Sequence, residues 1–369
     1  MRVEKLSVIQ LFCLIVIFEL GSAVVVGVGL GAKQAVWLPI TIGTISGIIL
    51  FILYDYIIKD SKNSTFIEIL KNSFGKVIGN VFAILYIAFF LYFAARVLRD
   101  FGELMGSTIL YETPLIAINT LFLVAVVYGC VLGVEVIGRM SEIFIPYVIL
   151  FGGLLFLFIY IAGLPDPNNL KPITGNGILP AIKATMPVSI TFPFGEVVTF
   201  IMFIPLLNRP KLAKKTGIIS ILVSGLILLI TNLTIISVLG AESANRALVP
   251  LVDALGQVNI ANFIQRLDPL AIIVLIVCGY FKITIFMCAG LLGLNEMTKN
   301  KFKRFMPYII GVLIVVLSIV MADNWVEHIK IGLEWVPKYL HLPAEIYFPL
   351  FLALFITIKR KIKNKSKTS

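Results

Sequence analysis

Long apolar runs recur along the whole chain, separated by short segments that hold charged and polar residues. Ten of these runs reach or approach the roughly 17–25 residues that a helix needs to cross a bilayer. They cover residues 6–31, 35–58, 80–104, 115–133, 137–163, 181–206, 216–239, 268–293, 305–322 and 344–358. Because backbone polar groups cannot remain unpaired in lipid, the runs predict helices. The pattern therefore predicts an all-α polytopic membrane protein with ten transmembrane helices.

Composition supports the same class. The 369 residues are 59% hydrophobic and 14% charged, whereas a soluble domain is about 45–50% apolar and about 25% charged. The longest predicted connection, residues 240–267, is too short for a separate globular domain. We expect a single transmembrane domain over residues 1–358 and a basic tail over residues 359–369.

Basic residues concentrate on one side of the predicted spans. The termini and the connections on their side hold 21 lysines and arginines, and the opposite connections hold seven. Positively charged connections remain in the cytoplasm, so we expect both termini to be cytoplasmic. This topology accounts for the net charge of +11, and the charge therefore gives no reason to expect nucleic acid as a partner.

Two predicted spans carry helix-breaking and charged residues near their middles. The first contains FELGSA, residues 18–23, and the sixth contains TFPFGEVV, residues 191–198. Pro193 removes a backbone donor and Gly195 tolerates non-helical dihedrals, so we expect local unwinding. Transporters use such broken helices to bind ligands and ions near the bilayer midplane.

The two breaks occupy matching places in the chain. Gly195 follows Gly21 by 174 residues, and five spans begin at each break. Because five is odd, the second set enters the membrane from the opposite side. This predicts a 5+5 inverted repeat with halves at about residues 6–163 and 181–358. The alternative is that Pro193 only kinks a helix and Gly21 only aids packing.

Three charged residues lie deep inside predicted spans: Glu19, Glu196 and Lys282. A charge at the bilayer centre costs about 2.5–3.5 kcal/mol on insertion scales, which favours a functional role. The helix dipole favours negative charge at Glu196 and disfavours it at Glu19, so Glu19 is the better candidate for carrying a proton. We expect Lys282 to pair with one glutamate, or to stand where a coupling sodium ion sits in related folds.

Two further groups have both a functional and a structural interpretation. Tyr280 and Thr284 share one helix face and would contact either a ligand or another helix. A second group lies on one face at the end of the third span, and we favour a salt-bridged stripe there over an outer gate. It consists of Arg96, Arg99, Asp100 and Glu103.

The cysteines and histidines give no sign of enzymatic or metal chemistry. The cysteines fall inside spans without paired spacing, so we interpret them as packing residues; they are Cys13, Cys130, Cys278 and Cys288. His328 and His341 fall in the outer connection before the last span and make a poor metal site. We therefore expect no enzyme activity, no metal and no cofactor.

Several stretches resemble the B-subunit permeases of bacterial spore nutrient-germinant receptors, in the amino acid–polyamine–organocation superfamily. They follow the family's order along most of the chain. They are ARVLRDFGEL (95–104) with TP at 113–114, GVEVIGRMSEIFIP (133–146), FPFGE (192–196), IPLLNRPKLAKK (204–215), and RLDPL with GYFKITIF (266–286).

The resemblance implies a ten-helix fold with a five-plus-five inverted repeat, a location in the spore inner membrane, and partnership with an A subunit and a C lipoprotein. It also implies a small nutrient, commonly an amino acid, bound between the broken helices. Carried onto this chain, the expected pocket consists of Glu19, Gly21, Ser22, Ala23, Thr191, Phe192, Phe194, Gly195, Glu196, Tyr280 and Thr284.

Three functions compete at this point: a ligand-sensing receptor subunit, a proton- or sodium-coupled amino-acid transporter, and a scaffold with a vestigial cavity. The charged residues inside the spans argue against the scaffold. Sensing and transport need the same pocket, so the sequence leaves both open.

Overall fold

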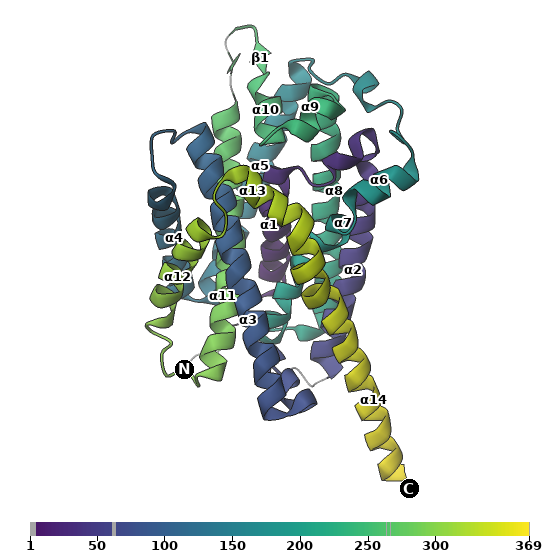
Figure 1. The fold of residues 1–369 in the computed structure, drawn as a ribbon, viewed down its shortest axis with the longest axis vertical. Helices are drawn as coiled ribbons and strands as arrows, with labels where there is room; N and C mark the ends of the chain where they lie inside the picture. The colour runs from purple at the N-terminus through teal and green to yellow at the C-terminus, as the bar shows by residue number, and fades with distance from the viewer. Residues whose placement is uncertain (1–4, 61–63, 263, 266, 369) are drawn as a thin grey trace.

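The computed structural model describes residues 5–60, 64–262, 264–265 and 267–368, and these residues are mostly helical (Figure 1). Within them, eight helices are long and apolar enough to cross a membrane. Counting each of two sharply bent helix pairs as one further span brings the number to ten. The predicted all-α polytopic class is therefore confirmed. The inverted repeat stays a prediction.

The long helices begin at local sequence signals. Ser7 accepts a hydrogen bond from the Gln10 backbone at the start of α1, and Thr65 does the same for Glu68 at the start of α3. Both are capping boxes, which satisfy the free amides of a first turn. The long helices are α1 (Val8–Val26), α2 (Trp37–Asp60), α3 (Phe66–Thr108), α4 (Leu115–Leu132), α5 (Val134–Ile161), α8 (Ala213–Leu239), α11 (Asp268–Met297) and α14 (Phe348–Thr368), the last preceded by the π-helix η7 (Pro337–Tyr347).

Two spans are bent. In the sixth span, α6 (Ile178–Thr185) and the segment from α7 (Val188–Thr191) through the 3₁₀ helix η3 (Glu196–Met202) meet at 69°. In the ninth, α12 (Met306–Val320) turns by 104° into α13 (Trp325–Lys330), which continues as the π-helix η6 (Ile331–Trp335).

Short elements cover one end of the bundle, and the termini lie at the other (Figure 1). Just before α1, Leu6 donates its amide to the Leu206 carbonyl, and near the C-terminus Lys359 donates to the Asn72 carbonyl. The short elements at the end away from the termini are η1 (Leu30–Ala35), η2 (Pro167–Leu170), α9 (Ala241–Arg246), α10 (Pro250–Gly256) and the antiparallel pair β1 (Asn259–Ile260) and β2 (Ile264–Gln265), whereas η4 (Ile204–Leu206) and η5 (Pro210–Leu212) lie at the end that carries the termini.

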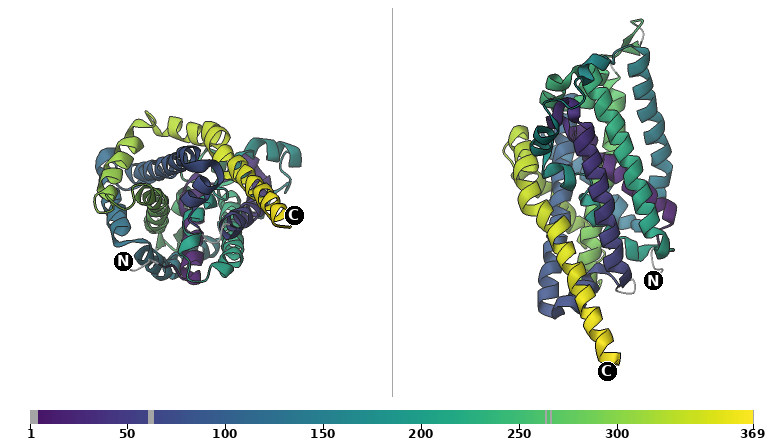
Figure 2. Two further views of the ribbon diagram at one scale, coloured as in Figure 1. Left: turned by 90° about the horizontal axis from the view of Figure 1, so that it is seen from below. Right: turned by 90° about the vertical axis from the view of Figure 1, so that its right-hand side faces the viewer.

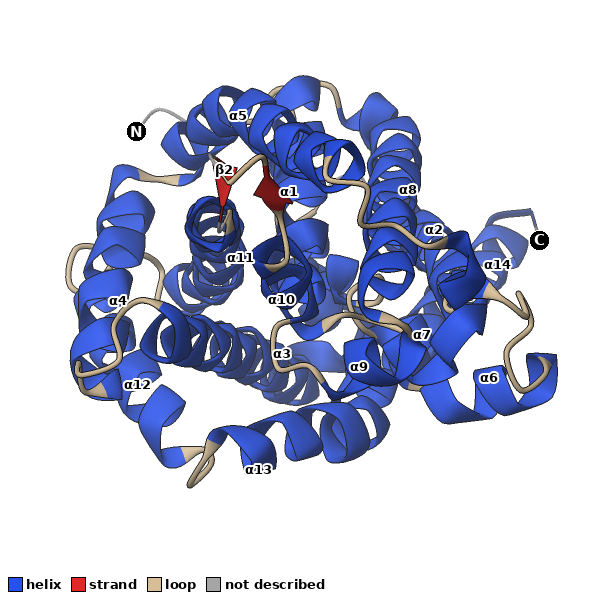
Figure 3. Cartoon of the chain, turned by 90° about the horizontal axis from the view of Figure 1, so that it is seen from above, coloured by secondary structure: helices blue, strands red, loops and turns tan. Residues whose placement is uncertain are grey.

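The first helix lies at the centre of the protein. Along its apolar window 83% of the residues are buried, against 22% for α5 and 28% for the last span. Viewed from the end opposite the termini, α1 is enclosed by other helices (Figure 3), whereas α14 runs along the outside (Figure 2). Polar residues of α1 therefore face protein and not lipid.

Two boundaries differ from the sequence prediction. The third helix begins at Phe66 and not near residue 80, because Thr65 caps an additional segment and Gly75, with a φ of 82°, redirects the chain. Helix α14 continues to Thr368, so residues 359–368 extend the last helix.

The close contact between α2 and α8 gives a test of the packing. A Cβ at Gly217 would lie 2.0 Å from the Phe51 ring. We therefore expect Gly217→Leu to lower the free energy of unfolding by about 1–3 kcal/mol, the usual cost of overpacking. Thermal unfolding of the detergent-solubilised protein measures it. The matched control is Gly153→Leu, because no described atom lies within 4 Å of a Cβ there; equal unfolding temperatures for the two variants would contradict the packing.

Candidate functional site

The break in α1 makes room for a lysine. Gly21 has non-helical dihedrals, with φ −23° and ψ −110°, inside an otherwise helical segment. A Cβ at this position would lie 2.6 Å from Cδ of Lys282, which comes from α11. Glycine is thus required here because the lysine side chain occupies the space that another side chain would fill.

Lys282 forms a buried ion pair at the break of the sixth span. Its Nζ lies 2.6 Å from Oε2 of Glu196, and the two side chains are 0% and 2% exposed. Glu196 is the first residue of η3, directly after the unwound segment. The rings of Phe18 and Phe192 lie 4.8 and 4.9 Å from the ammonium, close enough for cation–π attraction.

Glu19 lies in the same interior without a hydrogen-bonding partner. Its side chain is fully buried, and among the described residues neither carboxylate oxygen has a partner. The Ser22 hydroxyl, one turn further along α1, is buried and equally unpartnered. Lys282, Glu196 and Glu345 are the charged groups that act on Glu19 electrostatically. An unsatisfied buried carboxyl group is costly, and this cost indicates a role beyond packing.

The π-helix η7 adds two residues that the sequence analysis did not place in the site. His341 Nδ1 lies 2.8 Å from Glu345 Oε1, and both side chains are buried. A Cβ at Gly195 would lie 2.2 Å from Glu345 Oε2, so this carboxyl group contacts the broken segment directly. The assignment of His341 to an outer connection is therefore wrong. The available signal was HLPAE, which places a carboxyl group inside the predicted tenth span, four residues after a histidine.

The backbone of the last span is held to its neighbours near these residues. The Tyr54 hydroxyl donates to the Glu345 carbonyl at 2.6 Å, and the Tyr86 hydroxyl donates to the Ala344 carbonyl at 2.7 Å. A π-helix leaves carbonyls poorly placed for regular bonding, and such segments are frequent at functional sites. The two tyrosines thereby fix where η7 presents its histidine and carboxyl group.

The cluster has more acidic than basic groups. Three carboxyl groups, from Glu19, Glu196 and Glu345, gather around Lys282 and His341. If all three were charged, they would exceed the positive charge of the lysine and a protonated histidine together. Burying excess charge is unfavourable. The cluster can therefore bind a proton or the cationic group of a ligand.

A small cavity borders the cluster, and a larger vestibule lies beyond it. The cavity measures about 40 Å³, close to the space of one water molecule, so the site is closed in this structure. The vestibule measures about 490 Å³ and lies where η1, α6, α9 and α13 meet. Phe192 lines both spaces together with Val26, Ile329 and Leu333. These four side chains separate the charge cluster from the vestibule.

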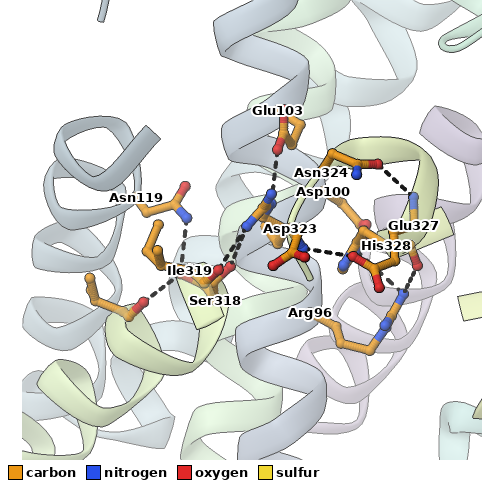
Figure 4. A network of polar contacts seen from close by, with 12 residues as sticks. Arg96, Asp100, Glu103, Asn119, Ser318, Ile319, Asp323, Asn324, Glu327 and His328 are labelled. Carbon is orange, nitrogen blue, oxygen red and sulfur yellow. Dashed lines mark hydrogen bonds and ion pairs between the residues drawn. The ribbon is translucent and has the colours of Figure 1, made fainter. Parts of the chain in front are cut away.

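The end of α3 fastens the bent ninth span to the bundle (Figure 4). Arg99 pairs with Glu103 at 2.9 Å and also donates to the Ser318 and Ile319 carbonyls at the end of α12. This part of the predicted stripe is structural.

The other half of the stripe borders the cavity. Asp100 contacts His328 Nε2 at 2.7 Å, and Arg96 donates to the His328 carbonyl at 2.9 Å. His328, in α13, is fully buried, which the sequence did not predict. Both Arg96 and Asp100 line the small cavity, which places the α13 attachment next to the charge cluster.

Some predicted pocket residues face elsewhere. A Cβ at Gly129 of α4 would lie 2.4 Å from the Tyr280 hydroxyl and 3.8 Å from Thr284. Each is two residues from Lys282, which is about 200° around a helix, so they point away from the cluster. Tyr280 and Thr284 therefore lie on the α4 side of α11, outside the charge cluster.

The side chains of other predicted pocket residues near the two breaks lie against neighbouring helices or backbone. Phe194 packs against Gly43 and Gly47 of α2, and the Thr191 hydroxyl donates to the Pro187 and Val188 carbonyls. Ala23 is buried within α1.

Among the described residues, no group of three His, Cys, Asp or Glu side chains is arranged to hold a metal ion.

The fold and the site define a multi-pass membrane protein with a closed, charged interior site. The chain belongs to a family described as spore germination proteins, whose family model matches residues 5–326. It is 37% identical over 367 residues to Spore germination protein KB of Bacillus subtilis (strain 168), covering 100% of this chain and 98% of that protein. The predicted family is thus confirmed, and its description is that of a germination protein and not of an enzyme.

More distant relatives come from the same organism. Spore germination protein A2 is 24% identical, over 86% of this chain and 86% of its own length. Spore germination protein YndE is 24% identical, over 78% of each. Together they support a germination-related, permease-like membrane protein.

The ion pair predicts a specific pattern of stability. We expect Lys282→Met to lower the free energy of unfolding by about 3–5 kcal/mol, because it leaves buried carboxyl groups without their cation. Adding Glu196→Gln should restore part of this loss. Thermal unfolding of the two single variants and the double variant measures the coupling, and purely additive losses would contradict the pair.

Proposed function

We propose that this chain is the nutrient-sensing membrane subunit of a spore germinant receptor. The observation that carries the proposal is the buried cluster at the two broken helices, where Glu19 and Ser22 have no hydrogen-bonding partner among the described residues beside the Lys282–Glu196 pair. Membership of the germination family supports the process, and the cluster would bind the small ligand once the closed cavity opens.

An amino acid suits the charges of this site. A zwitterion brings an ammonium, which would pair with the unpartnered Glu19 carboxyl group, and a carboxylate, which would approach Lys282. Both residues are inaccessible in the closed structure. Ligand entry from the vestibule therefore requires the Phe192 side chain to move from its place between the two spaces.

The elements around the entrance offer a route for the signal. Residues of η6 line both the cavity and the vestibule, and η6 joins α13 to η7. Movement of the Phe192 side chain would thus act on η6 and, through η6, on the last span. We infer that the signal passes to an A subunit and a C lipoprotein, in the spore inner membrane, with both termini of this chain in the cytoplasm.

The broken sixth span gives the decisive variant. A Cβ at Gly195 would lie 2.2 Å from Glu345 Oε2 and 2.6 Å from the Thr191 carbonyl. We expect Gly195→Leu to abolish the germination response while the protein remains in the membrane. The readout is loss of spore optical density after nutrient addition, with Gly153→Leu as the control. A normal response at normal protein level would remove the broken helix from the mechanism.

The function itself is tested by deleting the gene and exposing the spores to single amino acids and nucleosides. Loss of the response to one nutrient, restored by the intact gene, would establish a sensor and identify its ligand. An unchanged germination profile would instead refute the sensing role.

A second candidate function is a proton- or sodium-coupled amino-acid transporter, and the excess of carboxyl groups favours the proton. We expect Glu19→Gln to abolish any uptake that depends on a pH gradient, because the amide cannot take up and release a proton. Radiolabelled amino-acid uptake into membrane vesicles, with and without the gradient, measures this. Uptake by the intact chain that ignores the pH gradient would exclude the proton-coupled form.

A further inference from the structure

Two cysteines that are distant in the sequence meet inside the bundle. Cys130 lies near the end of α4 and Cys288 lies in the second half of α11, and their Sγ atoms are 3.2 Å apart. Cys130 also lies 3.9 Å from the Thr284 carbonyl. The sequence predicted packing residues without paired spacing, and in the structure all four cysteines are free, with this one pair brought into contact by the fold.

The thiol pair borders a large opening at the end of the bundle that carries the termini. A cavity of about 770 Å³ is lined by both cysteines, by Asn295 and Glu296 of α11, and by Lys301 and Arg304 of the connection to α12. Cys130 is half-buried, and the cavity has a polar and cationic wall. This cavity gives a small water-soluble reagent a route to the thiol pair.

The other two cysteines have a different environment. Cys13 and Cys278 are buried, as Cys288 is, but Cys278 borders an apolar crevice together with Leu20 and Val24 of α1 and not the polar cavity. Reactivity of a thiol requires access as well as a partner. Cys13 and Cys278 therefore serve as internal controls for the reactivity of the Cys130–Cys288 pair.

We propose that Cys130 and Cys288 form an oxidisable dithiol that links α4 to α11 by a disulfide. One peroxide molecule accepts two electrons and two protons from the two thiols, the peroxide O–O bond breaks, one S–S bond forms, and two water molecules leave. The sulfur atoms must approach by about 1 Å, since a disulfide bond is about 2.05 Å long.

The cross-link would act on the helix that carries the buried cation. Cys288 lies six residues after Lys282 on α11, so the disulfide would fix this helix against α4 within two turns of the ion pair. This inference rests on the thiol geometry alone and does not depend on the proposed sensing function.

Thiol counting tests the proposal. The full-length protein in detergent is treated with hydrogen peroxide, denatured, and labelled with a maleimide of high mass. We expect the labelled thiols to fall from four to two, and the label to return fully after reduction with dithiothreitol. Mass spectrometry of a digest should then show the Cys130 and Cys288 peptides joined, with the loss of two hydrogen atoms.

Variants separate this linkage from other oxidation products. Cys13→Ser with Cys278→Ser should form the same cross-link and retain no free thiol after oxidation. Cys130→Ser and Cys288→Ser should each keep three labelled thiols. Four thiols remaining in the native protein, a linkage between two chains, or a cross-link that persists in Cys130→Ser would each overturn the proposal.

Discussion

The interior of this protein depends on where a single ammonium group is placed. Lys282 is completely buried, and its stem fills the space left by Gly21, so the break in α1 and the position of α11 are mutually dependent. Glu196 then brings the break of the sixth span to the same point. A buried lysine is stable only when its charge is balanced. This requirement joins three helices that are far apart in the sequence at one location.

Residues of the last two spans complete the charge cluster and its entrance. The end of α3 holds the α12–α13 bend through Arg99 and His328 (Figure 4). The π-helix η7 then brings Glu345 to Gly195. These contacts make the entrance and the charge cluster parts of one connected structure. A disturbance at one end of this path would act on the other through these contacts, as the proposed sensing function requires.

The sequence predicted the helical class, the ten apolar spans and the two breaks, because each follows from local residue types. It also predicted that Lys282 would meet a glutamate, since a charge in a span needs a partner. It did not predict that His341 and Glu345 would turn inward, because Pro337 and Pro343 resemble the signals of an exposed connection and here belong to a π-helix. The facing direction of Tyr280 and the meeting of Cys130 with Cys288 depend on how α11 rotates against α4, and no local pattern encodes that rotation.

The ring of Phe192 occupies the approach to the ammonium that it also helps to stabilise. Anything that reaches Lys282 from the vestibule must first displace the aromatic face, so the two compete for one cation. The observed affinity of such a molecule is then a difference, reduced by a cation–π attraction of about 0.5–2 kcal/mol. A weak apparent affinity at this site would therefore be the expected result of an exchange of partners, and would not by itself indicate poor contacts.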